Sequence, residues 1–401
     1  MSAVQPAARA APLAAAILAA VTVSHLLNDL VQSLVVSVYP MLRERHGLSF
    51  TQLGMITMTY SLTASVLQPL IGIATDRRPV PFALCLGMAS TLAGVLLLSG
   101  AGAMWSLLAA AALIGIGSSV FHPEASRVAR LASGGRYGLA QSVFQVGGNL
   151  GSSLGPVAAV AVVMPRGQWA IAWFAAAALA AIAILHRVGR WYASHLAEIA
   201  ARPTQAGASE RGSLRAAAWP LSILGVLVFS KYVYLAGLTN FYAFYLMDRF
   251  GLETRAAQLH LFAFLAAVAA GTVLGGPLGD RIGRRRVIWI SILGVAPFTI
   301  VLPHVGLWAT AILAGIIGLV LASAFSAILV YAQALVPGRV GLVSGLFFGL
   351  AFGMAGIGAA VLGGLADRIG IAAVYEICGF LPLLGLLTVF LPDIERRPAS
   401  A

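Results

Sequence analysis

Apolar residues fill long, uninterrupted stretches of this chain, and short polar segments separate them. Most stretches reach the roughly 20 residues that an α-helix needs to cross a bilayer. They are continuous rather than alternating, so they predict spanning helices and not the strands of a membrane barrel. The pattern therefore predicts an all-α membrane protein with twelve transmembrane helices. We place them at 13–41, 50–75, 81–100, 103–123, 138–163, 168–187, 218–247, 256–279, 287–303, 306–334, 342–365 and 371–392.

The longest polar stretch separates six predicted spans from the other six. We predict an N-terminal six-helix bundle at 1–188, a cytoplasmic linker at 189–216 and a C-terminal six-helix bundle at 217–401. The two halves also match each other at a nearly constant spacing of 203 or 204 residues, which predicts two bundles related as parallel repeats. The matching pairs are Gly47-Leu48 with Gly251-Leu252, Asp76-Arg77 with Asp280-Arg281, Gly138-Leu139 with Gly341-Leu342, Phe144 with Phe347, and Gly155 with Gly358.

Composition supports a lipid environment. Hydrophobic residues make up 60% of the chain and charged residues 9%, whereas a soluble domain carries about 25% charged residues. The net charge of +12 does not indicate nucleic-acid binding, because the arginines lie in short loops where they set membrane orientation. With both termini inside, 18 arginines face the cytoplasm and 6 face outward. We expect a multi-pass protein of the bacterial inner membrane with cytoplasmic termini.

Several negative expectations follow from the same sequence. Cys85 and Cys378 both lie in apolar runs, so a disulfide framework is not expected. The first apolar run is too long for a cleaved signal peptide. The chain has no phosphate-binding Gly-rich loop with lysine, no catalytic constellation and seven dispersed histidines. We therefore expect neither an enzyme nor a metal site, and no cofactor apart from the proton as coupling ion.

Two loop motifs point to a family. Gly276-Pro-Leu-Gly-Asp280-Arg281-Ile-Gly283-Arg284-Arg285 follows the eighth span, and a weaker copy, Gly72-Ile-Ala-Thr-Asp76-Arg77, follows the second. This pair resembles the signature of the major facilitator superfamily. Gly151-Ser-Ser-Leu-Gly155-Pro156 partly resembles the antiporter motif of its drug exporters. Phe121-His-Pro-Glu-Ala-Ser-Arg127, Gln141-Ser-Val-Phe-Gln-Val-Gly-Gly-Asn149 and Ser24-His25-Leu-Leu-Asn28-Asp29 resemble the fosmidomycin resistance protein family.

The resemblance implies proton-coupled drug export by alternating access, with the anionic phosphonate fosmidomycin as the suggested substrate. It also implies that helices 1, 4, 7 and 10 line a central cavity, and we expect a monomer. Two other functions stay open. One is a proton-coupled importer of an organic anion or sugar, and the other is a membrane sensor or scaffold that transports nothing.

Helix 1 carries a polar stripe of His25, Asn28, Asp29 and Gln32, which fall within an arc of about 100°. A carboxylate at the bilayer centre costs about 2.5–3.5 kcal/mol, and such groups usually face a cavity or a partner. Asp29 is the candidate proton-binding carboxylate, because removal from water favours its protonated form. His25 could relay that proton, and Asn28 and Gln32 could contact substrate. Alternatively, the stripe only fixes helix packing through hydrogen bonds.

Lys231, the only lysine, lies near the middle of helix 7. It could coordinate an anionic substrate or pair with Asp29 across the two halves, and Tyr234, on the same helix face, could line the cavity with it. Alternatively, Lys231 forms a structural charge pair or reaches the interface along its flexible stem, and the tyrosines serve packing.

Helix 4 ends with His122-Pro123-Glu124, followed by Arg127. Two interpretations compete for Glu124. It could join His122 on a proton path, or it could pair with Arg127 in a cytoplasmic charge network that latches the outward-facing state. His122 lies deeper and could contact substrate. The predicted gate consists of Asp76, Arg77, Glu124, Arg127, Asp280, Arg281, Arg284 and Arg285.

Helix 5 presents amides and small residues. Gln145 and Asn149 could bind a polar ligand, whereas Gly151, Gly155 and Pro156 could let helices approach and slide. Asp367-Arg368 repeats part of the loop motif after helix 11, where we expect a turn and a helix cap.

Overall fold

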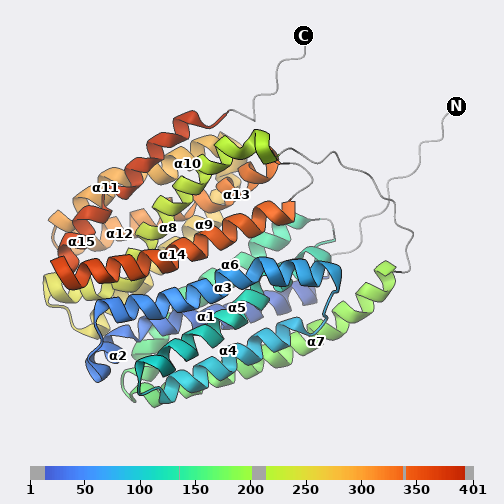
Figure 1. Cartoon of the computed structure of the whole chain (residues 1–401), viewed down its shortest axis with the longest axis horizontal. Helices are drawn as coiled ribbons and strands as arrows, with labels where there is room; N and C mark the ends of the chain where they lie inside the picture. Colours follow the sequence, from blue (N-terminus) through green and yellow to red (C-terminus); the bar gives the residue numbers. More distant parts are fainter. Residues whose placement is uncertain (1–13, 135, 201–213, 337–339, 393–401) are drawn as a thin grey trace, which may run out of the picture.

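The computed structural model describes residues 14–134, 136–200, 214–336 and 340–392, and within these ranges the chain is helical with no β-strand. Long helices run roughly along one direction, with the N-terminal half on one side of the bundle and the C-terminal half on the other (Figure 1). The expected all-α membrane fold is confirmed.

The N-terminal half runs from the start of α1 to the end of α7. Its elements are α1 (Ala15–Ser37), α2 (Tyr39–His46), α3 (Phe50–Arg77), α4 (Ala83–Gly100), α5 (Met104–Ala132), α6 (Tyr137–Ala158), the π-helix η1 (Ala159–Val163), the 3-10 helix η2 (Gln168–Phe174) and α7 (Ala175–Ala200).

The C-terminal half begins with a single long helix, and several of its later spans are built from shorter pieces. Its elements are α8 (Leu214–Phe250), α9 (Thr254–Ile282), α10 (Arg284–Ile292), η3 (Leu293–Val295), α11 (Ala296–Val301), η4 (Leu302–His304), α12 (Leu307–Ala322), α13 (Ala324–Leu335), α14 (Val340–Ile369), α15 (Ile371–Cys378) and η5 (Leu381–Phe390).

By length and hydropathy, 11 helical segments of the described chain can cross a membrane. The one predicted span outside this set, at 50–75, corresponds to α3, a helix of 28 residues that packs against α5 and α14. Pro69 lies inside α3, and its lower hydropathy reflects Thr, Ser and Gln side chains that face other helices rather than lipid. The twelve-helix prediction therefore agrees with the structure.

The internal repeat is visible in where helices begin. Helices α3 and α9 start 204 residues apart, at Phe50 and Thr254, and α6 and α14 start 203 residues apart, at Tyr137 and Val340. The turns repeat as well, because Gly47 (φ 62°) precedes α3 and Gly251 (φ 66°) precedes α9. A residue in the left-handed conformation can end a helix, and glycine adopts this conformation without the strain that a Cβ would add. Both copies therefore use glycine.

The sixth span extends further than the sequence suggested. Helix α7 continues to Ala200, past the predicted bundle boundary at 188. Tyr192 is buried in a hydrophobic cluster, and the rings of Trp191 and His195, one turn apart, stack at 4.9 Å. These contacts support the additional turns. Of the predicted linker, residues 189–200 belong to α7 and 214–216 to α8, whereas 201–213 lie outside the described chain.

The two halves meet along α3 and α14, which run side by side at their boundary (Figure 1), and along α6 and α9. Gly54 makes the α3–α14 approach close, since a Cβ there would lie 2.8 Å from the Cα of Ala360. The hydroxyl of Ser65 donates a hydrogen bond to the carbonyl of Gly349 at 2.7 Å. This seam positions the cavity between the halves.

Candidate functional site

A cavity of about 350 Å³ lies between the two halves, which is within the size range of small-molecule sites. Helices α1, α3, α5 and α6 line one side, and α8, α9, α12, α13 and α14 line the other. The N-terminal half supplies most of the polar groups, whereas the C-terminal half supplies a largely apolar wall with one cation. The predicted site residues that line the cavity are His25, Asp29, Gln32, His122, Gln145, Asn149 and Lys231.

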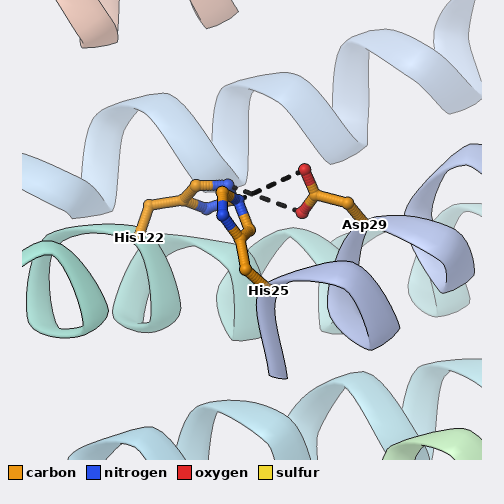
Figure 2. Close-up of side chains that lie close together, drawn as sticks. All are labelled: His25, Asp29 and His122. Carbon is orange, nitrogen blue, oxygen red and sulfur yellow. Dashed lines mark ion pairs between the residues drawn. The ribbon is translucent and has the colours of Figure 1, made fainter. Parts of the chain in front are cut away.

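The carboxylate of Asp29 faces two neighbouring histidine rings (Figure 2). Its Oδ2 is 3.3 Å from Nε2 of His25, one turn earlier on α1, and its Oδ1 is 3.7 Å from Nε2 of His122 on α5. The amide of Asn28 also donates a hydrogen bond to Oδ1 at 3.0 Å. We call His25, Asp29 and His122 the His–Asp–His cluster.

Backbone carbonyls fix the hydrogen positions on both imidazole rings. Nδ1 of His25 lies 2.8 Å from the carbonyl oxygen of Phe144, and Nδ1 of His122 lies 3.0 Å from that of Ser118. A carbonyl oxygen only accepts hydrogen bonds, so each Nδ1 carries the hydrogen. Both Nε2 atoms therefore point their lone pairs at the Asp29 carboxylate, and a proton or a metal cation between them relieves the repulsion.

Local packing explains how the cluster forms. The ring of Phe144 stacks on His25 with centroids 4.1 Å apart. On the neighbouring turn of α6, a Cβ at Gly148 would lie 2.8 Å from Oδ2 of Asp29 and would overlap the His25 ring. Only glycine at 148 lets α6 approach the cluster this closely.

Unpaired amides lie beside the cluster. Gln32 accepts a hydrogen bond from the hydroxyl of Tyr60 at 2.5 Å, and its Nε2 makes no hydrogen bond within the described chain. The buried Nδ2 of Asn149 is likewise without a partner among the described residues. These donors are available to acceptor atoms of a ligand. Tyr60 was not among the predicted site residues, although Thr57, Tyr60 and Ser61 form a polar patch at helical spacing within an apolar run.

Two predicted cavity residues lie elsewhere. Asn28 is fully buried and stands behind Asp29, where it orients the carboxylate instead of facing the cavity. Tyr234 packs in the hydrophobic core with Tyr242 and Tyr245, and Tyr245 stacks on Tyr375 at 4.3 Å. Asn28 and Tyr234 therefore do not line the cavity as predicted. Each lies on the buried face of its helix, outside the part of that face that borders the cavity.

Lys231 faces the cavity but does not pair with Asp29. Its ammonium lies 3.5 Å from the carbonyl oxygen of Ala322 and 5.1 and 5.4 Å from the ring centroids of Tyr232 and Phe325. Its side chain is 2% exposed, and no ion pair to it occurs among the described residues. The expected pairing with Asp29 is absent, and Lys231 instead leaves a cation available to an anionic ligand.

The predicted gate is partly visible. Glu124 is buried and accepts a hydrogen bond from the Thr75 hydroxyl at 2.6 Å, and it lies 3.5 Å from Arg127. Arg127 also donates to the Thr75 carbonyl at 2.8 Å, near the C-terminus of α3. The contact between Glu124 and Arg127 that the predicted charge network needs is present, and Glu124 does not border the cavity. The role of this network as a gate stays a prediction.

The rest of the gate is described only in part. The side chains of Asp76, Arg77 and Asp280 lie outside what the structure describes. Arg281 is exposed, and Arg284 is half-buried. Arg285 donates a hydrogen bond to the carbonyl of Val389 at 2.8 Å. The second motif therefore reaches the end of η5 within its own half.

The small residues of α6 pack against the backbone of α1. A Cβ at Gly151 would lie 2.9 Å from the backbone nitrogen of Leu30, and one at Gly155 would lie 2.7 Å from the Cβ of Ser33. Pro156 has no N–H, so the carbonyl of Ser152 lacks its intrahelical donor. The hydroxyl of Ser33 donates to that carbonyl at 2.5 Å.

Comparison with known proteins identifies relatives along nearly the whole chain. The family model of the Major Facilitator Superfamily matches residues 21–257 and 224–401. The chain is 58% identical over 375 residues, 93% of its length and 92% of the relative, to the Fosmidomycin resistance protein of Escherichia coli (strain K12). It is 42% identical over 379 residues, 93% of its length and 91% of the relative, to the Uncharacterized MFS-type transporter YfnC of Bacillus subtilis (strain 168).

A solved structure shares the fold. The chain superposes on a bacterial homolog of the human lysosomal transporter Spinster, in an inward-facing and occupied conformation, with a TM-score of 0.73, 17% identity and coverage of 95% of both chains.

Proposed function

Because the chain belongs to the Major Facilitator Superfamily, whose members are transporters and not enzymes, we propose that it exports small molecules in exchange for protons by alternating access. The observation that carries this proposal is the geometry of the His–Asp–His cluster. Two Nε2 lone pairs and one carboxylate converge at the wall of a cavity between the two halves, which is an arrangement that binds and releases protons.

The conformational coupling follows from the helices that the cluster joins. When a proton occupies Nε2 of an imidazole, the ionised carboxylate of Asp29 attracts that ring, and the carboxylate thereby links His25 of α1 and His122 of α5. A proton that neutralises Asp29 weakens its attraction for a protonated imidazole, so the link between α1 and α5 loosens and the helices can rearrange. Loss of the proton to the cytoplasm restores the link. A proton entering from outside thereby drives the return step of the transport cycle.

The cavity suits a substrate rich in acceptor atoms. Lys231 supplies a positive charge, and Gln32 and Asn149 supply unpaired N–H donors. An oxygen-rich anion satisfies both features. Since a relative at 58% identity is named a Fosmidomycin resistance protein, fosmidomycin, an anionic phosphonate, is the substrate to test first.

We place the protein in the bacterial inner membrane with both termini in the cytoplasm, because 18 arginines lie on that side and 6 on the other. A single chain contains both walls of the cavity, so a monomer suffices for transport.

The experiment that tests the function uses purified protein in proteoliposomes with a pH-sensitive dye inside and a pH gradient as the driving force. Fosmidomycin and protons should cross the membrane in opposite directions, whichever way the protein is inserted in the proteoliposomes. Asp29→Asn should abolish this exchange, and Asp248→Asn, which changes an exposed carboxylate of α8, should leave it intact. Wild-type exchange rates in Asp29→Asn would refute the proton site. Proton and substrate movement in the same direction would instead indicate an importer.

A further inference from the structure

The side chains of the His–Asp–His cluster have the spacing of metal ligands. One donor atom from each of His25, Asp29 and His122 lies within 4.8 Å of the other two, and the two histidine–carboxylate distances are 3.3 and 3.7 Å. A tetrahedral Zn²⁺ with bonds of about 2.1 Å holds neighbouring ligand atoms about 3.4 Å apart. Side-chain rotations that bring the three donor atoms closer together would close the site on one ion.

The far side of each imidazole is already supported. Metal-binding histidines usually donate their second N–H to a carbonyl or carboxylate, which orients the ring and fixes the tautomer. Here His25 bonds to the carbonyl of Phe144, and His122 bonds to the carbonyl of Ser118. The stacked ring of Phe144 further restrains His25. Figure 2 shows both rings pointing their free nitrogen at the carboxylate of Asp29.

The ligand set selects a class of cation. Two imidazole nitrogens and one carboxylate oxygen suit Zn²⁺, Co²⁺ or Ni²⁺, whereas Mg²⁺ and Ca²⁺ prefer oxygen alone. Nε2 of His25 is buried and makes no hydrogen bond within the described chain, so a metal would satisfy it. Asp29 and His122 are 15% and 16% exposed and border the cavity, which leaves a fourth position for water or a ligand atom.

We propose that His25, Asp29 and His122 form a binding site for a divalent d-block cation of the zinc class, open to the central cavity. Gln145 and Asn149 of α6, Tyr60 of α3 and Lys231 of α8 complete the polar surroundings. Binding itself does not depend on transport. A second consequence rests on the proposed function: the bound ion ties α1 to α5 and blocks the transport cycle.

Binding is tested by titrating the purified full-length chain, carrying a tag without histidines, with Zn²⁺ in a calorimeter and with Co²⁺ in a spectrophotometer. We expect one ion per chain and the intense visible bands of four-coordinate Co²⁺. Mg²⁺ should give no heat. His25→Gln, Asp29→Asn and His122→Gln should each weaken Zn²⁺ binding by at least about tenfold.

Two further variants separate ligand loss from misfolding. His304→Gln changes an exposed histidine and should bind Zn²⁺ like the wild type. Gly148→Ala retains all three ligands but places a methyl group against His25 and Asp29, and it should also weaken binding. Wild-type Co²⁺ spectra without four-coordinate bands, or Zn²⁺ affinity unchanged in all three ligand variants, would overturn the proposal whatever the transport assay shows.

The transport arm uses the same proteoliposomes. Zn²⁺ at a concentration that saturates the wild type should stop exchange, and a chelator should restore it. If Zn²⁺ binds but exchange continues, the blocking role is wrong and the metal site stands. If the protein moves neither substrate nor protons in the absence of Zn²⁺ but still binds Zn²⁺ when the ion is added, the proposed function is wrong and the metal site stands.

Discussion

The carboxylate of Asp367 accepts two hydrogen bonds from Thr51, one from its backbone N–H at 2.7 Å and one from its hydroxyl at 2.6 Å. A third comes from the backbone N–H of Phe50 at 2.8 Å. Asp367 lies in the last turn of α14 and caps the first turn of α3. A carboxylate at a helix N-terminus is stabilised by the free N–H groups and the helix dipole. One end of the seam between the two halves is thereby closed.

Asp367→Asn should open this end more often. The substitution removes the charge but keeps the shape, and a carboxylate at a helix N-terminus contributes about 1 kcal/mol, equivalent to a shift of about fivefold between open and closed states. The test uses a Ser61→Cys variant, because Ser61 is a buried cavity residue. The measured quantity is the rate at which a membrane-impermeant maleimide labels this cysteine.

The reporter chain for this test carries Cys85→Ser and Cys378→Ser, since both native cysteines are free. Arg368→Gln serves as the control, because it changes the neighbouring charge and keeps the cap. Faster labelling in Asp367→Asn than in Arg368→Gln is expected. Equal rates in the two variants would show that the cap does not control access.

Lys231→Gln should lower transport of anionic substrates by at least about tenfold and leave neutral substrates nearly unchanged. The reason is that Lys231 is buried without a carboxylate partner among the described residues, so its charge is available to the substrate. Uptake of matched anionic and neutral compounds measures the effect. Equal loss for both classes would indicate a structural role.

Lys231→Met should also not lower the thermal stability in detergent. A buried cation without a counter-charge carries a desolvation cost, which an apolar side chain of similar length removes. Thermal unfolding followed by intrinsic fluorescence gives the comparison. A marked drop in the unfolding temperature would mean that Lys231 makes a stabilising interaction.

Ser33→Ala should destabilise the protein only while Pro156 is present. The Ser33 hydroxyl bonds to the Ser152 carbonyl, which Pro156 leaves without an intrahelical donor. In Pro156→Ala the restored N–H takes that role. A double-mutant cycle should therefore give a coupling of about 0.6–1.7 kcal/mol, the range for hydrogen bonds between membrane helices. Additive effects would contradict this account.

Glu124→Gln should reduce stability without moving the pH dependence of transport. Glu124 is buried with Thr75 and Arg127, and removing one partner of such a network costs about 1–3 kcal/mol. Asp29→Asn is the comparison, because the proposed proton site should affect the pH profile. A shifted pH profile in Glu124→Gln at unchanged stability would revive the proton-path interpretation.

The sequence predicted much of the site on α1 and little of what surrounds it. His25, Asp29 and Gln32 follow one another at helical spacing, so a regular helix of known period places them on one side. The same period could not separate the cavity side from the buried side, and Asn28 and Tyr234 were therefore assigned to the cavity incorrectly. That distinction depends on where α5, α6 and α15 pack.

Contacts between distant segments were also beyond the sequence. The histidines looked dispersed, yet α1 and α5 bring His25 and His122 to the same carboxylate. Asp367 was expected to form a helix cap, but the sequence did not show that the capped helix is α3, whose Thr51 lies 316 residues away. Such long-range contacts depend on helix crossing angles and offsets, which are determined by the packing of many side chains.

The sequence by itself determined the membrane environment, the helical fold, the repeat and the polar stripe, because each depends on composition or on periodicity within one segment. Only the tertiary structure decided that Asp29 has two histidine partners, that Lys231 has no carboxylate partner among the described residues, and that the halves close against each other at Asp367. The contacts of Asp29 with His122 and of Asp367 with Thr51 join segments about a hundred or more residues apart, and packing alone brings them within reach.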